Sequence, residues 1–400
     1  MGAPRTTAVQ RRLEDRKARR LLWCAMKHRS THLTVQVRNG EQTGQWLFSW
    51  IPQASRTSPP SLGGIHPLLN DYIRPDAIES LPAMPPRLSI VIPTHDTREL
   101  TLRCLETIAR ASSPGSVEVI VVDDASGDGT SAAIRELHPG VEVLRNDPAA
   151  GFSRSANRGL ARASAGVLLL LNSDTEVGPG SPERLLEALE ADPGLGIVGA
   201  ALHYPDGSPQ WSGGEAPSHA WFFALASGLP ALLARLPLYR RLKPLEPAGP
   251  VGVDWVTGAA LGLRREVWEA VGPLDEGYRF YAQDLDFCVR ARRAGWEVAI
   301  DPAFRVLHHH GATIGRKEGA GRRQHPELLW MDLLRWARKH RGERWADRAA
   351  LLLRTGSALR LAGRLLALPF LPRAERDSWR AESRALGAAR QKLAIREDSV

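Results

Sequence analysis

Two acidic clusters each follow an apolar stretch of the kind that forms a buried strand. Asp123 and Asp124 come directly after VEVIVV, and Asn172-Ser173-Asp174 comes directly after VLLLL. In an open α/β sheet, ligands bind in the crevice outside the carboxyl ends of the strands. A hard divalent cation such as Mg²⁺ or Mn²⁺ takes a few oxygens from protein carboxylates and the rest from water and substrate phosphates. The two clusters therefore indicate a site for a cation and a diphosphate at one edge of a sheet.

Other interpretations of these clusters stay open. The run from Gly127 to Ala132 matches a loose dinucleotide-binding fingerprint, although the two neighbouring aspartates would repel a pyrophosphate. A calcium-binding loop beginning at Asp124 would need a glutamate where Arg135 stands. An ordinary Asp/Gly turn is the remaining alternative for the first cluster, and a turn or helix N-cap is the alternative for the second.

A third acidic pair opens a predicted helix. In the run YRFYAQDLDF (278–287), Asp284 stands where the helix begins, and Asp286 cannot share its direction on the helix. An aspartate at a helix start is commonly a cap. The alternative is a general base that accepts the proton of an attacking hydroxyl, because displacement of a diphosphate from an anomeric carbon needs such a base on one side and a cation on the other.

Short β-rich runs alternate with helical stretches from Leu88 onward. Alternation at this spacing predicts parallel βαβ units covered on both faces, which is a doubly wound α/β sheet. Strands are expected at 88–93, 117–122, 141–144 and 167–171, and helices near 97–110, 129–137 and 152–164.

The regions on either side of this sheet differ from it in composition. Residues 1–30 predict a basic helix or arm, the alternation at 33–48 around Asn39-Gly40 predicts a β-hairpin, and residues 52–87 have the Pro, Ser and Gly content of a linker. The Arg-, Leu- and Ala-rich end of the chain predicts helices. We therefore expect an N-terminal region (1–87), a central α/β domain (88–315) and a basic helical C-terminal region (316–400).

The net charge of +9 is unevenly distributed. Residues 1–30 and 316–400 together carry +17, which leaves −8 on residues 31–315. A nucleic-acid-binding protein usually carries its basic surface on the folded module itself, so no nucleic-acid partner is expected. Basic helices of this kind either contact an anionic membrane peripherally or present solvated faces, and both alternatives stay open.

The cysteines and the apolar stretches bear on the cellular compartment. Cys24, Cys104 and Cys288 indicate neither a disulfide framework nor a zinc site, which fits a reducing environment. The N-terminus lacks the apolar core of a signal peptide. The stretch 220–238 is interrupted by Gly228-Leu229-Pro230 and Arg235, so it predicts a buried or interfacial helix pair and not a membrane span. We expect a cytoplasmic protein, and the inner face of the cell membrane is the expected place of any peripheral contact.

Eight collinear segments resemble the family 2 glycosyltransferases, and most closely the rhamnosyltransferase-like members that build bacterial surface polysaccharides. The resemblance covers about residues 88–315, more than half of the chain. The segments are IVIPTHD (90–96), VIVVDDASGDGT (119–130), RNDPAAGFSRSANRGL (145–160), LLLLNSDTEV (168–177), GIVGAAL (196–202), DWVTGAALGLRREVWEAVGPLDEGY (254–278), QDLDFCVRARRAGW (283–296) and VLHHHG (306–311).

This resemblance implies a fold, a chemistry and a set of residue roles. The implied fold is GT-A, a doubly wound mixed α/β sheet with a Rossmann-like nucleotide-binding half, followed here by a helical C-terminal extension. The implied reaction uses a UDP- or dTDP-sugar donor and a divalent cation, and it inverts the anomeric carbon. The matched positions are Pro93, Thr94 and Asp96 in the segment that frames base and ribose; Asp123 and Asp124, which contact uracil or thymine and ribose; Asn172, Ser173 and Asp174 in the metal–diphosphate motif, with Asp174 the ligand; Asp254, Trp255, Thr257 and Gly258 on the acceptor side; and Asp284, the general base.

Two positions depart from the residues usual in the family, and a third adds a candidate metal ligand. Gln283 stands where the family usually has Glu, which leaves Asp284 as the base but removes a neighbouring negative charge. Asp96 stands where Asn is common, a change that hydrogen bonding to ribose tolerates. The match of His308 to the family's His-x-x-Gly element makes it a second candidate metal ligand, and a strand-end histidine with ordinary hydrogen bonds is the alternative.

The sequence thus leads to a functional hypothesis with one main rival. The hypothesis is an inverting transferase that moves rhamnose or another hexose from a nucleoside diphosphate sugar to a glycan or lipid-linked acceptor. The rival is a non-catalytic nucleotide-sugar-binding or scaffold protein on the same fold, which Gln283 suggests. A nucleotidyltransferase is disfavoured because PTHDTREL after the first strand is not a glycine-rich basic loop.

Overall fold

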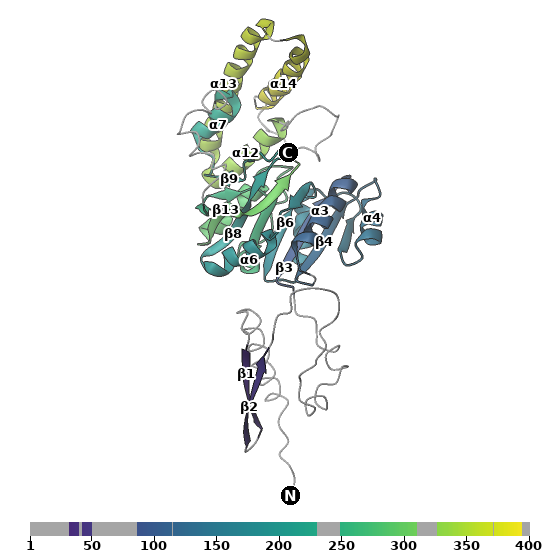
Figure 1. Ribbon diagram of the computed structural model, residues 1–400. Helices are drawn as coiled ribbons and strands as arrows, with labels where there is room; N and C mark the ends of the chain where they lie inside the picture. The colour runs from purple at the N-terminus through teal and green to yellow at the C-terminus, as the bar shows by residue number, and fades with distance from the viewer. Residues whose placement is uncertain are drawn as a thin grey trace. The chain divides into compact units, whose positions relative to one another are not determined.

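The computed structural model describes residues 32–39, 42–49, 86–113, 115–229, 249–309, 326–370 and 372–393 (Figure 1). The chain divides into two compact units, Met1–Pro82 and Ala83–Val400. In the first unit, β1 (His32–Asn39) and β2 (Gln42–Ser49) pair antiparallel from His32↔Ser49 to Asn39↔Gln42. This is the hairpin that the alternating pattern predicts. The expected arm at 1–30 and nearly all of the expected linker lie outside the described residues.

The second unit is built on a nine-stranded mixed sheet in the order β10-β13-β8-β12-β6-β3-β4-β5, with β7 paired to β13. Neighbours β6, β3, β4 and β5 are parallel, and β13 is parallel to β8, whereas β12 runs antiparallel to both β6 and β8. A further two-stranded pair joins β9 to β11. The strands are β3 (Leu88–Thr94), β4 (Val117–Asp124), β5 (Glu142–Asn146), β6 (Val167–Leu171), β7 (Thr175–Val177), β8 (Leu195–His203), β9 (Gly213–Gly214), β10 (Val251–Gly252), β11 (Trp255–Val256), β12 (Ala260–Arg264) and β13 (Glu297–His308).

The central strand β3 separates from one neighbour at its carboxyl end. All seven of its residues are buried, as expected for a strand with helices over both faces. Its pairing with β4 continues to Thr94↔Asp123, but its pairing with β6 stops at Val91↔Leu170. Pro93 has no N–H to donate, so it is tolerated where only one neighbouring strand remains paired. The sheet therefore opens between β3 and β6, at the edge where ligands bind in folds of this type.

Helices cover both faces of the sheet, because successive residues of a strand point to opposite sides. Ile90 and Ile92 pack with Leu105 of one helix layer, whereas Val91 packs with Leu160 of the other. The prediction of a doubly wound mixed α/β sheet is confirmed. The helices are α3 (Arg98–Ala111), α4 (Thr130–Leu137), α5 (Phe152–Arg162), α6 (Ser181–Ala191), α7 (His219–Ser227), α10 (Arg265–Val271) and α11 (Gln283–Arg293).

The predicted helical C-terminal extension is also confirmed. It comprises α12 (Pro326–Arg341), α13 (Glu343–Ala367), the 3₁₀ turn η2 (Leu368–Phe370) and α14 (Arg373–Lys392). A third cluster of buried side chains joins α7, α11 and these helices through Phe222, Leu285 and Trp336. Of the helix pair expected at 220–238, α7 is present and the second half lies outside the described residues. Among the helices that the structure describes, none is both long and apolar enough to cross a bilayer.

Gly159 of α5 supports a test of the packing between helix and sheet. A Cβ at this position would collide with Cγ1 of Val91 and lie 3.0 Å from Cγ2 of Val122. We expect Gly159→Ala to lower the free energy of unfolding by about 1–3 kcal/mol, because overpacking outweighs the gain in helix propensity. Gly363→Ala in α13, where a Cβ would meet nothing within 4 Å, is the matched control and should leave stability equal or raise it. Denaturant unfolding of both variants measures this, and equal stability of the two would contradict the packing.

Candidate active site

The loops that follow β3 and β4 are joined by hydrogen bonds at the carboxyl edge of the sheet. Asp96 adopts a positive φ of 49°, which turns its backbone N–H toward the Ser126 hydroxyl at 2.9 Å. Its carboxylate accepts from the Gly127 N–H at 2.7 Å. His95 Nδ1 lies 2.6 Å from the Asp124 carbonyl oxygen. The segment after Pro93 and Thr94 and the segment after Asp124 thus form one rigid surface, which brings these predicted residues together.

The carboxylates of Asp123 and Asp124 are buried, and both accept hydrogen bonds from other groups of the protein. Asp123 accepts from the Ser126 N–H at 2.9 Å, from the Ser131 hydroxyl, and from Arg145 Nη1 at 2.5 Å. Burial alone would raise the pKa of Asp123, but these hydrogen bonds and the guanidinium outweigh burial and hold the pKa below its ordinary value. Asp123 therefore remains ionised and organises its own loop.

Asp124 is held in the same way by a different segment. It accepts from Asn146 Nδ2 at 2.8 Å and from the backbone N–H groups of Ala150 and Gly151 at 2.7 and 2.8 Å. These bonds overcome the opposing effect of burial and lower the pKa of Asp124. The carboxylate fixes the start of α5 below the sheet edge. Contact of Asp123 or Asp124 with a base or a ribose stays a prediction.

A chain of hydroxyl groups connects the end of β3 to the segment 172–174. Thr94 Oγ1 lies 2.8 Å from Thr97 Oγ1 and 2.8 Å from Thr101 Oγ1. Thr97 Oγ1 in turn lies 3.0 Å from Ser173 Oγ. All four residues are buried. The residues expected to frame the nucleotide and those expected to hold the diphosphate are therefore parts of one network.

Asp174 and His308 face each other at the end of β6 and β13. His308 Nε2 lies 3.3 Å from Asp174 Oδ1, and both side chains are buried. On its other side, His308 Nδ1 lies 2.7 Å from Gln210 Oε1. Because an amide oxygen only accepts, Nδ1 carries a proton, and Nε2 is the ring nitrogen directed at the carboxylate. Antiparallel pairing of Thr175 with His308 in β7 and β13 produces this meeting, which sequence spacing could not reveal.

Asp284 lies in the first turn of α11, after Ala282, which has a positive φ of 64°. Its Oδ2 accepts from the Gly258 N–H at 2.8 Å, and its Oδ1 accepts from the Leu285 N–H at 2.8 Å. The carboxylate borders a small, mostly apolar pocket that also includes Leu170 and Phe287. Burial raises the pKa of Asp284, and the hydrogen bonds offset only part of that effect. Asp284 is thus a more basic carboxylate than Asp123 or Asp124.

Asp286, the alternative base in the same helix, is placed differently. It is fully buried and accepts from Arg290 Nε at 2.8 Å, Lys339 Nζ at 2.7 Å and His340 Nε2 at 2.7 Å. Burial opposes ionisation, but the hydrogen bonds from His340 and Lys339 and the charge of Arg290 hold the pKa of Asp286 far below its ordinary value. Asp286 therefore fastens α11 to α12 and is poorly suited to accept a proton.

Asp332 of α12 holds the loop that leads into α11. Its buried carboxylate accepts from the backbone N–H groups of Arg279, Phe280 and Tyr281 at 3.1, 2.9 and 2.8 Å. Sequence reasoning missed this residue, together with Lys339, His340 and Gln210. An acidic residue inside the apolar run LLWMDLLRW was the available signal for Asp332.

The predicted acceptor-side residues divide into two groups. The Thr257 N–H donates to Ser212 O at 2.9 Å, and Gly258 contacts Asp284 as described. The Asn172 N–H donates to Ala259 O at 3.0 Å, so the segment 257–259 lies between Asp284 and the segment 172–174.

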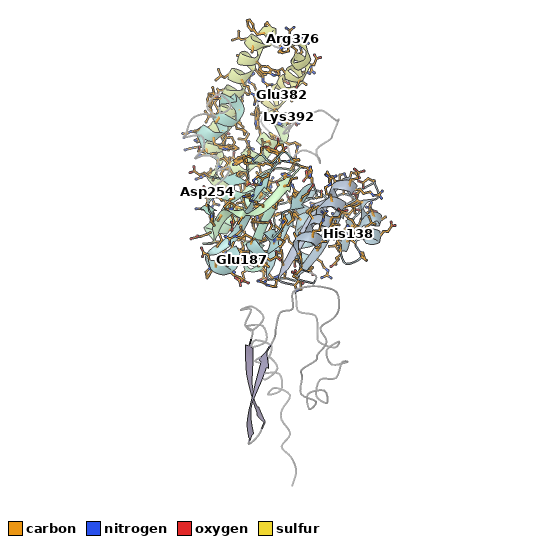
Figure 2. The ribbon with its side chains drawn as sticks, viewed as in Figure 1. His138, Glu187, Asp254, Arg376, Glu382 and Lys392 are labelled. Atoms are coloured by element: carbon orange, nitrogen blue, oxygen red, sulfur yellow. The ribbon has the colours of Figure 1, made fainter. Side chains whose placement is uncertain are left out.

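Asp254 and Trp255 turn to other partners. Asp254, labelled in Figure 2, accepts from the Ala216 N–H at 2.8 Å and pairs with Arg292 at 2.9 Å. Trp255 donates to Glu215 O at 3.2 Å and meets Trp211 edge-on, with ring centroids 5.1 Å apart. These contacts anchor the segment 214–216 to β11, and a direct role toward an acceptor stays a prediction for both residues.

Gln283 occupies a buried position beside Asp284, the predicted base. Its Oε1 is buried and has no hydrogen-bond partner among the residues that the structure describes. A glutamate there would place a second buried negative charge next to Asp284, whereas the amide is neutral. Gln283 therefore adds no second negative charge next to the Asp284 carboxylate.

Comparison with known proteins identifies the family. The model of "Glycosyl transferase family 2" matches residues 89–262. An N-acetylglucosaminyl-diphospho-decaprenol L-rhamnosyltransferase of Mycobacterium tuberculosis is 31% identical over 293 residues, which are 67% of this chain and 91% of that protein. The O-antigen biosynthesis protein RfbC of Myxococcus xanthus is 27% identical over 241 residues, 57% of this chain and 18% of that one.

Among solved structures, a mannosyltransferase from Pyrobaculum calidifontis in complex with GDP-Man and Mn²⁺ aligns over 79% of this chain and 89% of that one, with a TM-score of 0.46 and 19% identity. The sequence matches show the family, because this chain aligns with nearly the whole length of the mycobacterial rhamnosyltransferase. The chain belongs to glycosyl transferase family 2 and is an enzyme of that family.

Proposed function

We propose that this enzyme transfers rhamnose or another hexose from a nucleoside diphosphate sugar to a hydroxyl of a glycan or lipid-linked acceptor, with inversion, in surface polysaccharide biosynthesis. The observation that carries the proposal is the position of Asp284. Its carboxylate has a raised pKa, lies at the carboxyl edge of the sheet, and is separated from the segment 172–174 only by residues 257–259. A base and a diphosphate-binding segment on either side of the short loop 257–259 suit a direct displacement.

In the proposed reaction, Asp284 takes the proton of the acceptor hydroxyl while the oxygen of that hydroxyl bonds to the anomeric carbon. The bond from that carbon to the donor's diphosphate breaks, and its electron pair leaves with the diphosphate. Attack and departure on opposite faces invert the carbon. A raised pKa makes Asp284 a better proton acceptor than an exposed aspartate, because general-base efficiency rises as the pKa approaches the working pH.

Asp174 and His308 fit a divalent cation. Two ligands that bind one ion at about 2.1 Å each lie at most about 4.2 Å apart, so the 3.3 Å between Oδ1 and Nε2 is compatible. The Gln210 contact orients the imidazole in the way that outer partners orient metal ligands. No group of three or more His, Cys, Asp or Glu side chains suited to a metal occurs among the described residues. The remaining ligands would come from water and the diphosphate, as a hard cation prefers. When bound, the cation would neutralise charge on the leaving diphosphate.

The donor can be identified by thermal shift. A donor at 100 times its dissociation constant adds about 2.7 kcal/mol of apparent stability. dTDP-rhamnose, UDP-hexoses and GDP-mannose with Mn²⁺ form a suitable panel, followed by transfer assays with the donor that stabilises the chain. Absence of both stabilisation and transfer with every donor would favour the scaffold alternative.

The role of Asp284 can be tested by substitution. We expect Asp284→Asn to retain donor binding and to lose transfer by about 10²- to 10⁴-fold, because the amide cannot take a proton. In the unsubstituted enzyme, kcat/KM should fall as pH drops through the raised pKa of Asp284, so its acidic limb lies above that of an ordinary aspartate. The exposed Asp192→Asn is the control. Near-normal transfer by Asp284→Asn would assign the base elsewhere.

The role of Asp174 can be tested by metal binding. Asp174→Ala should lose Mn²⁺-dependent turnover and bind Mn²⁺ more weakly, while far-UV circular dichroism stays unchanged. Manganese binding is followed by electron paramagnetic resonance in the absence of donor, which separates a lost ligand from lost activity. Glu187→Ala, a change of an exposed carboxylate on α6 (Figure 2), is the control. Manganese-stimulated turnover that survives Asp174→Ala would rule the residue out as a ligand.

Asp332 should act as a positioning residue for the base. An amide at this position offers one acceptor oxygen where the carboxylate now serves three N–H groups. We expect Asp332→Asn to lower the free energy of unfolding by about 1–3 kcal/mol and to lower kcat while the donor KM stays unchanged. Asp347→Asn in α13 is the control. A kcat equal to that of the unsubstituted enzyme would mean that α12 does not influence the base.

A further inference from the structure

The last two helices form a hairpin, α13–η2–α14, of which only one end is packed. Buried side chains of α13 end at Ser357, and those of α14 are Leu386 and Ala389. The packed end contacts α7 and α12 and shares their apolar cluster. The remainder of the hairpin extends away from the sheet, with Arg376 at its far end and Lys392 at its base (Figures 1 and 2).

The far end of the hairpin carries apolar side chains but has no core. Between 358 and 385, no described side chain is buried. Leu365 and Leu366 are 70% and 76% exposed, and Phe370 in η2 is 88% exposed. Two helices without a buried interface are marginal in water, because most helical stability comes from packing an apolar face. A cluster of large exposed apolar groups marks a surface that another apolar phase covers.

The same end of the hairpin is strongly basic. The sequence from 354 to 384 contains seven arginines and three acidic residues. Arg364 pairs with Glu382 and stacks over Trp379 at 5.1 Å, and Arg380 pairs with Asp377 at 3.4 Å. Arg384 is exposed and has no ion-pair partner among the described residues. An open pocket between the helices is lined by Arg364, Leu365, Leu368, Trp379, Arg380, Ser383 and Arg384.

We propose that the far end of this hairpin docks on an anionic lipid bilayer. Leu365, Leu366 and Phe370 enter the boundary of the acyl chains, and Arg380 and Arg384 contact the phosphates of the headgroups. Apolar groups beside arginines match the two layers of a membrane interface, because the apolar side chains contact the acyl chains and the arginines contact the headgroups. The attachment is peripheral, because no described helix can span a bilayer.

Charge favours a lipid surface over a second copy of this chain. Two copies that met through the far end would bring two arginine-rich surfaces together, and like charges at an interface are costly. An anionic leaflet attracts the same arginines, each contributing about fivefold to binding at low salt. This attraction weakens as salt screens it, whereas the apolar insertion does not. Vesicle binding requires no sugar donor, so it is independent of the proposed reaction.

The test is sedimentation of the full chain with phosphatidylcholine vesicles that contain or lack about 30 mol% phosphatidylglycerol, at about 0.05 and 0.5 M NaCl. We expect binding to the anionic vesicles that weakens at high salt. The variant Leu365→Ser/Leu366→Ser/Phe370→Ser should bind at least about tenfold more weakly at both salt concentrations. The variant Arg380→Ala/Arg384→Ala should bind up to about 25-fold more weakly at low salt and show a smaller salt dependence than the unsubstituted chain.

Matched controls lie on the sheet-bearing part of the molecule. Leu137→Ser removes a 59% exposed leucine of α4, and Arg110→Ala removes an exposed arginine of α3. Both should bind like the unsubstituted chain. The proposal is overturned if the unsubstituted chain does not sediment with anionic vesicles, or if both hairpin variants bind as the controls do. It is also overturned if sedimentation equilibrium shows a dimer that the hairpin variants abolish.

Discussion

The hydrogen bond from the Gly258 amide to the Asp284 carboxylate joins the sheet to the helix that carries the proposed base. It exists because the sheet is mixed. The antiparallel strand β12 begins at Ala260, opposite Leu171, where the parallel strand β6 ends. An antiparallel strand starts at the edge where its parallel neighbours finish, so the residues just before β12 arrive at the carboxyl edge. Gly258 is thereby placed beside the segment 172–174, and its hydrogen bond holds the Asp284 carboxylate near the same segment.

The acidic residues of this region differ in whether their hydrogen bonds and neighbouring charges outweigh burial. Asp123 and Asp124 each receive several hydrogen bonds, and Asp286 accepts from Arg290, Lys339 and His340, so all three stay ionised although they are buried. Asp284 receives two backbone N–H groups and a hydrogen bond from Thr257 beside an apolar pocket, and burial prevails. The ionised carboxylates of Asp123, Asp124 and Asp286 hold loops and helices in place. The raised pKa of Asp284 is the property that the proposed proton transfer requires, so one edge can combine rigid structure with the proposed base.

Sequence patterns predicted the parts of this arrangement that depend on local order. Apolar runs such as VLLLL become buried strands, and polar residues directly after them must lie at the carboxyl edge, so the proximity of Thr94, Asp123 and Ser173 follows from βαβ connectivity. Contacts made by distant segments left no such signal. The meeting of Asp174 with His308 depends on pairing of β7 with β13 across 130 residues of chain, and the support from Asp332 and His340 depends on how α12 packs. The hydrogen bonds that occupy Asp123 and Asp124 also depend on loop geometry that composition does not encode.

The C-terminal helices serve two separable purposes, and the separation lies along their length. α12 packs against α11 and supplies Asp332 to the loop 279–281 and Lys339 and His340 to Asp286. The packed end of the hairpin completes the same apolar cluster. Removing the whole extension would therefore take Lys339 and His340 away from Asp286 and leave the carboxylate with Arg290 of its own helix. A shortened chain would lose this support of α11 and the proposed lipid contact at once. Substitutions at Leu365, Leu366 and Phe370, which are exposed at the far end of the hairpin, alter the outer surface alone.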